Sequence, residues 1–153
     1  MADTARTDDE LIVGIDLGTT NSLVALCDES GPRILAGEDG SAILPSVVQM
    51  RPGEDPVVGA AARAHAVEFP TETVYSVKRL MGRSAADLAD DVEHLAYEIV
   101  EGEQQTARVR VDDRVYSAEE ISAMILNALQ RRAEQALGRT VRKAVVTVPA
   151  YFD

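Results

Sequence analysis

The chain has 153 residues, of which 46% are hydrophobic, and a formal net charge of -11 at pH 7. This length can bury a sizeable core in one domain. The acidic balance excludes nucleic acid and anionic membranes as partners, because both would repel such a surface.

Cysteine usage and the first residues indicate a cytoplasmic protein. The single cysteine, Cys27, cannot form an intramolecular disulfide, and its place in an apolar strand pattern predicts a small buried hydrophobic residue in a reducing compartment. Residues 1–10 are acidic, unlike a signal peptide, and we expect them to form a disordered tail. No apolar run is long enough to cross a membrane.

The first motif combines a buried strand, an acid and a turn of small residues. An apolar run over Leu11–Ile15 leads to Asp16 and then to Gly18, Thr19 and Thr20. The glycine lets the backbone come close to a ligand, and the threonine hydroxyls can bind an oxyanion or a metal-bound water. Asp16 is costly at the end of a buried strand unless it is hydrogen-bonded or faces a cation such as hydrated Mg²⁺. The pattern predicts a phosphate site. The alternative is an ordinary β-hairpin turn in which Asp and Thr satisfy each other.

The next part of the chain alternates turn signals with short strands and two helices. The expected strands are 22–27, 33–35 and 46–50, the first two completing an antiparallel meander, and the expected helices are 58–67 and 71–81.

In the second of these helices, Val74, Val77, Lys78 and Met81 would share one face. Lys78 would then point toward neighbouring elements, and the alternative is a lysine that extends to water.

His65 and His94 have no cysteine or acid at ligand spacing, so we expect packing or surface roles rather than metal binding.

The last third contains the strongest local signals. Residues 87–95 are acidic and loosely helical, and three strands are expected at 97–101, 106–111 and 114–116. A capping box over Ser117–Glu120 opens the longest helix, which Gly138 closes. A continuous apolar run over 143–148 predicts a buried, parallel strand.

This order of elements predicts an α/β fold, a mixed sheet with helices and an inserted subdomain. The core would comprise residues 11–45 and 117–153, and the insert residues 46–116. A buried parallel strand usually feeds another crossover helix, so we also expect the domain to be truncated.

Four separated motifs resemble one family. GIDLGTTNS at 14–22, LPSVV at 44–48, VKRLMGR at 77–83 and VTVPAYFD at 146–153 together resemble the ATPase domain of the DnaK-type chaperones, the heat shock protein 70 family. Their order and spacing match from residue 11 to residue 153. The resemblance implies an actin-like (ribonuclease H-like) ATPase fold, of which this chain would be an incomplete first lobe.

The resemblance also implies roles for particular residues. The first phosphate loop would be formed by Asp16, Gly18, Thr19, Thr20 and Asn21. Asp16 would lie near the hydrated magnesium ion, and Lys78 would position the attacking water and support the γ-phosphate. Arg79, Pro149 and Tyr151 would relay the nucleotide state to a peptide-binding domain.

The implied cofactors are ATP or ADP with Mg²⁺, and K⁺ is a further candidate cation. The implied partners of an intact parent are unfolded or client polypeptides, a J-domain co-chaperone and a nucleotide-exchange factor. SVKRLMGRS at 76–84 and Asp153 resemble the members that serve iron-sulfur cluster assembly, which would add a scaffold protein. The family's second phosphate loop, its adenosine contacts and its peptide-binding domain have no counterpart in these residues, so turnover by this chain alone is not expected.

Two other interpretations of the function remain open. A sugar kinase of the same actin-like superfamily carries a similar Gly-Thr-Thr turn, but would not be expected to carry VKRLMGR or VPAYF. A non-catalytic interaction module would use the same lobe to bind a partner through its uncovered edge and cleft face.

Overall fold

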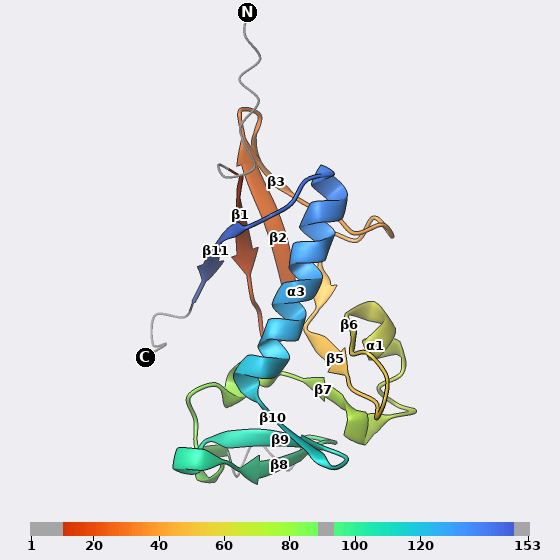
Figure 1. Ribbon diagram of the computed structural model, residues 1–153, viewed down its shortest axis with the longest axis vertical. Coiled ribbons are helices and arrows are strands. Elements are labelled where there is room, and N and C mark those ends of the chain that lie inside the picture. The colour runs from red at the N-terminus through yellow and green to blue at the C-terminus, as the bar shows by residue number, and fades with distance from the viewer. Residues whose placement is uncertain (1–10, 89–93, 149–153) are drawn as a thin grey trace, which may run out of the picture.

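The computed structural model describes residues 11–88 and 94–148. In Figure 1 the longest helix lies over one sheet, and two smaller sheets lie beyond the end where that helix begins. None of the described helices is long and apolar enough to span a membrane.

The largest sheet holds both ends of the described chain. Its path runs β11 (Lys143–Thr147), β1 (Ile12–Asp16), β2 (Asn21–Asp28) and β3 (Gly31–Ile34), and β4 (Leu44–Pro45) pairs with β2. The β1–β2 and β2–β3 pairs are antiparallel, which confirms the predicted meander, and β1 pairs with β11 in parallel, as predicted.

Helix α3 (Ala118–Leu137) covers one face of this sheet (Figure 1). The predicted capping box is present, with Ser117 as N-cap and Glu120 as its partner, and Gly138 ends the helix in the left-handed region at φ 62°. The fully buried side chains of Ile121 and Ile125 join the core cluster that includes Val13 and Val24 of the sheet. A short polar cap thus begins a helix that is held by its apolar stripe.

The two smaller sheets lie between β4 and α3 in the sequence. One runs β6 (Val57–Val58), β5 (Val47–Gln49) and β7 (Thr73–Tyr75), and the other runs β10 (Arg114–Ser117), β9 (Ala107–Val111) and β8 (Glu98–Glu101). The three strands of the second sheet were predicted. Helix α1 (Ala60–Ala64) is shorter than the expected helix over 58–67, because turns continue the chain from residue 65 to residue 69.

The predicted helix over 71–81 is wrong. This stretch is a 3₁₀ turn η2 (Pro70–Glu72), strand β7, and a 3₁₀ turn η3 (Val77–Leu80). Thr73 and Val74 are β-branched and almost fully buried where β7 pairs with β5, so sheet pairing overrides the helical spacing. Ser76, at φ 56°, then turns the chain into η3.

The structure also differs from three smaller expectations. Strand β11 is exposed along its whole length, not buried, because β1 is its one strand neighbour among the described residues. Cys27 is exposed rather than buried. The loosely helical stretch 87–95 contributes to a short 3₁₀ turn η4 (Ala86–Leu88), and residues 89–93 lie outside the described part of the chain.

Candidate functional site

The loop from Leu17 to Thr20 joins β1 to β2, beside the end of β11. Asp16 closes β1 and is paired in register with Thr147 of β11. Thr147 Oγ1 donates a hydrogen bond to Asp16 Oδ1 at 2.8 Å. Parallel strands bring their carboxyl ends to one edge of a sheet, and the sequence had not singled out Thr147.

The loop connects the antiparallel strands β1 and β2, as in the alternative of an ordinary β-hairpin turn. The hydrogen bond of its aspartate differs from the one that this alternative expected. Asp16 accepts from Thr147, on a distant strand, rather than from Thr19 or Thr20. A Cβ on Gly18 would come within 2.1 Å of the Asn21 carbonyl oxygen, so the turn excludes every residue with a side chain at this position.

Lys78 reaches this loop from η3. Its Nζ donates to the Leu17 carbonyl oxygen at 2.6 Å, across 61 positions of sequence. Val77 and Leu80 are buried on either side of it in η3 and hold the turn against the core. The lysine therefore does not simply extend to water. An ammonium group has three protons, so this contact leaves two for another acceptor.

The predicted relay residues are only partly described. Arg79 is exposed, and its backbone N–H donates to the Ser76 carbonyl oxygen at 3.0 Å. Pro149 and Tyr151 lie outside the described residues. Arg79 therefore has a place near Lys78, and its role stays a prediction.

The residues at the loop fit a magnesium-bound phosphate group. Asp16 is exposed, and among the described residues its carboxylate accepts one hydrogen bond, from the neutral hydroxyl of Thr147, so it can also accept from the waters of a hydrated ion. Asn21 Oδ1 is buried and has no hydrogen-bond partner there, which leaves an acceptor for a ligand or water. Among the described residues, no group of three or more His, Cys, Asp or Glu side chains could hold a metal ion.

Sequence reasoning missed two serines that bind the same loop. Ser22 and Ser46 are each 2% exposed, and both contact the backbone of Gly18. They stand inside two of the quoted motifs, GIDLGTTNS and LPSVV. Small polar residues within otherwise apolar stretches are the signal that could have found them, because buried hydroxyls require partners.

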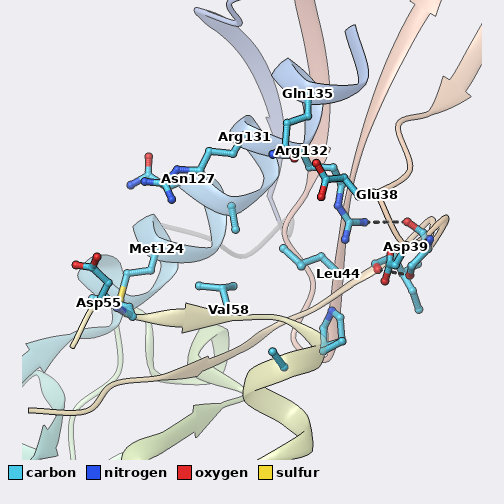
Figure 2. A pocket seen from close by; sticks show the side chains of 18 residues that line it. Glu38, Asp39, Leu44, Asp55, Val58, Met124, Asn127, Arg131, Arg132 and Gln135 are labelled. Atoms are coloured by element: carbon cyan, nitrogen blue, oxygen red, sulfur yellow. Dashed lines mark hydrogen bonds between the residues drawn. The ribbon is translucent and has the colours of Figure 1, made fainter. Parts of the chain in front are cut away.

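A cavity of about 650 Å³ lies elsewhere in the structure, as a groove beside α3 (Figure 2). It is lined by α3 and by residues from the segments 37–45 and 55–61, and none of its lining residues belongs to the loop over Asp16–Asn21. Arg132 spans it, donating from Nη1 to the Ser41 carbonyl oxygen at 3.0 Å. The groove is therefore separate from the predicted phosphate site.

Comparison with known families identifies the family of this chain. A sequence model described as Hsp70 protein matches residues 12–153. The match covers the loop after β1, Lys78 and β11, and it favours the chaperone family over the sugar kinases of the same superfamily. Members of this family bind ATP or ADP with Mg²⁺ through an actin-like ATPase domain, and the mixed α/β fold described above is that of such a lobe. The chain belongs to the Hsp70 family.

Proposed function

We propose that this chain forms an ATP-binding part of a DnaK-type molecular chaperone that couples ATP hydrolysis to the binding and release of client polypeptides. The observation that carries this proposal is the contact between Lys78 Nζ and the Leu17 carbonyl oxygen, which brings a cation to the small-residue loop. Membership of the Hsp70 family supports the same function.

Each residue at the loop has a chemical task in this proposal. Thr19 and Thr20 bind phosphate oxygens through their hydroxyls, and Asp16 accepts hydrogen bonds from waters of the magnesium ion. When bound, that ion neutralises charge on the phosphates. Lys78 uses its remaining protons to orient the attacking water and to stabilise the negative charge that spreads over the γ-phosphate.

The finer assignments rest on the resemblance in sequence. Residues 11–45 and 117–153 form the core subdomain and residues 46–116 the insert, which supplies Lys78. Arg79, Pro149 and Tyr151 relay the nucleotide state, and K⁺ is an additional cation. J-domain and nucleotide-exchange partners act on the intact chaperone in the cytoplasm, and SVKRLMGRS at 76–84 supports a role with an iron-sulfur scaffold.

Calorimetry with magnesium-ATP tests the binding part of this proposal. We expect the 153-residue protein to bind at millimolar nucleotide or below, and Asp16→Asn and Thr20→Val each to weaken binding about tenfold, because each removes one charged or polar contact. Lys143→Ala is the matched surface control, since Lys143 begins β11 at the end remote from Thr147. No heat at millimolar magnesium-ATP would contradict ATP binding and favour the non-catalytic interaction module.

A hydrolysis assay distinguishes the role proposed for Lys78 from that of the residues that bind ATP. In the full-length chaperone, Lys78→Ala should abolish single-turnover hydrolysis while ATP still binds, because the ammonium acts on the transition state more than on the ground state. Turnover retained by Lys78→Ala would contradict its assigned role.

A further inference from the structure

Both backbone polar groups of Gly18 are bound by serine side chains. The Gly18 N–H donates to Ser22 Oγ at 3.2 Å, and Ser46 Oγ donates to the Gly18 carbonyl oxygen at 2.8 Å. The two hydroxyl oxygens are themselves 2.8 Å apart. These three contacts form a closed ring around one peptide segment of the loop, which we call the serine ring.

The direction of every bond in the serine ring follows from counting protons. A serine hydroxyl has one proton, and that of Ser46 is used on Gly18. The bond between the hydroxyls must then be donated by Ser22 to Ser46. Ser22 in turn accepts from the Gly18 N–H. Each of the two hydroxyls therefore accepts one hydrogen bond and donates another, and the three bonds run in one direction from the Gly18 N–H to the Gly18 carbonyl oxygen. Bonds in such a chain polarise and strengthen one another.

The serine ring is buried, so its hydrogen bonds are not easily replaced by bonds to water. Ser22 and Ser46 are each 2% exposed, so water does not readily replace a missing partner. The Ser46 N–H also donates to the Thr20 carbonyl oxygen at 2.9 Å, which ties the loop to the same serine at a second point. Gly18 uses its own N–H on Ser22, so this backbone donor is not available to a phosphate.

We propose that Ser22 and Ser46 are positioning residues of the phosphate loop. They act through Gly18, and hold Thr19 and Thr20 in the geometry that receives phosphate oxygens, without touching the nucleotide themselves. The inference rests on the proposed function, because it gives the loop a ligand. It also explains why LPSVV accompanies GIDLGTTNS in one chain, since Ser46 connects the loop to the segment between β4 and β5.

Amide hydrogen exchange tests the serine ring without any ligand. Ser46→Ala should speed exchange of the Gly18 amide about tenfold, because Ser22 loses the acceptor that orients it. Ser122→Ala is the matched control: Ser122 is also 2% exposed, but its hydroxyl has no hydrogen-bond partner among the described residues, so exchange at Gly18 should not change. Unchanged exchange in Ser46→Ala would overturn the inference.

Binding of magnesium tripolyphosphate and magnesium-ATP tests the positioning role. Ser22→Ala and Ser46→Ala should each weaken both ligands by a similar factor, about tenfold, while exchange in α3 stays as in the wild type. The double variant should be little worse than either single one, since opening the ring once removes its effect. Wild-type affinity in the folded single variants would overturn the inference.

The two experiments test the proposed function and the serine ring separately. A wild-type protein that binds neither ligand contradicts the proposed function. The exchange experiment needs no ligand, so it still decides whether the serine ring holds Gly18. Should Ser46→Ala fail to fold, Ser46→Cys keeps a weak donor of similar size, and its Gly18 amide should exchange faster than in the wild type. Equal exchange would overturn the ring.

Discussion

At the scale of single residues, Tyr97 shows how a polar group is kept in the core. Its side chain is almost fully buried, its hydroxyl donates to the Tyr75 carbonyl oxygen, and its ring lies edge-on to that of Tyr75 at a centroid distance of 5.4 Å. Burial raises the pKa of Tyr97 well above its ordinary value, with a smaller contribution from Tyr75, and the positive charge of Arg79 opposes the shift.

The raised pKa of Tyr97 predicts a loss of stability in strong base. The folded protein keeps this proton at a pH where the unfolded chain has released it, so the stabilisation is complete below about pH 10 and is lost as the pH rises above that value. Tyr97→Phe should reduce the free energy of unfolding by about 1 kcal/mol at neutral pH, since the Tyr75 carbonyl loses its donor. It should also show a shallower decline above pH 10. Urea unfolding at a series of pH values measures both, and an equally steep decline in the variant would contradict the assignment.

Thr147 provides a second prediction at the residue scale. Its hydrogen bond to Asp16 fixes one carboxylate oxygen, so Thr147→Val should raise the magnesium concentration needed for ATP binding about threefold. Thr147→Ser keeps the hydroxyl and should behave as the wild type. Calorimetric ATP titrations at several magnesium concentrations distinguish them, and identical magnesium dependence in all three proteins would rule out this contribution.

At the scale of elements, α3 is determined by signals close to its ends. Ser117 Oγ accepts from the Glu120 N–H at 3.1 Å, and Glu120 Oε2 accepts from the Ser117 N–H at 2.7 Å. Both contacts join residues three positions apart, so local sequence is sufficient to predict them. The stretch over 71–81 is the contrasting case, because its spacing permits a helix until β5 offers a pairing partner.

The cap predicts a measurable stability effect. Ser117→Ala should lower the free energy of unfolding by about 1 kcal/mol, because the Glu120 N–H loses its acceptor at the helix start. Ser117→Asp supplies another good N-cap and should stay within a few tenths of the wild type. Equilibrium urea denaturation provides the comparison, and an equal loss in both variants would show that the cap is not the cause.

At the scale of the whole molecule, one face of the main sheet carries exposed apolar side chains. The pairing of Gly14 with Val145 and with Ala25, and of Ala25 with Ile34, places these residues on the face that also holds Ile12. Val145 is 65% exposed and Ile12 50%, and α3 packs on the opposite face. Such a surface beside a strand edge favours association.

This face predicts self-association of the 153-residue protein. Its sedimentation coefficient should rise with concentration, and Val145→Lys should suppress the rise, because a charge on the strand opposes edge and face contacts. Val67→Lys is the matched control, since Val67 is 93% exposed on another part of the surface and should leave association unchanged. A wild type that remains monomeric, or equal suppression by both variants, would contradict a role for this face.

At the candidate site, the features that depend on neighbouring residues could be predicted from the sequence. The Gly-Thr-Thr turn after Asp16 follows from a short stretch in which each residue limits the next. The position of Lys78 beside Leu17 cannot be predicted from a short stretch of sequence, because 61 positions separate the two residues and the intervening chain must fold first. Its assignment came from resemblance, while the helix in which we expected it is absent.

The sequence by itself determined the meander, the capped helix α3, the parallel strand β11 and the loop that follows Asp16, since periodicity, caps and turn residues act over a few positions. Only the tertiary structure decided that Thr147 binds Asp16, that Lys78 meets the loop, that Ser22 and Ser46 close a ring on Gly18, and that Cys27 and β11 are exposed. These facts depend on which surfaces meet after folding. A buried hydroxyl or ammonium takes whichever partner the packed chain presents, and that partner can lie far away in sequence.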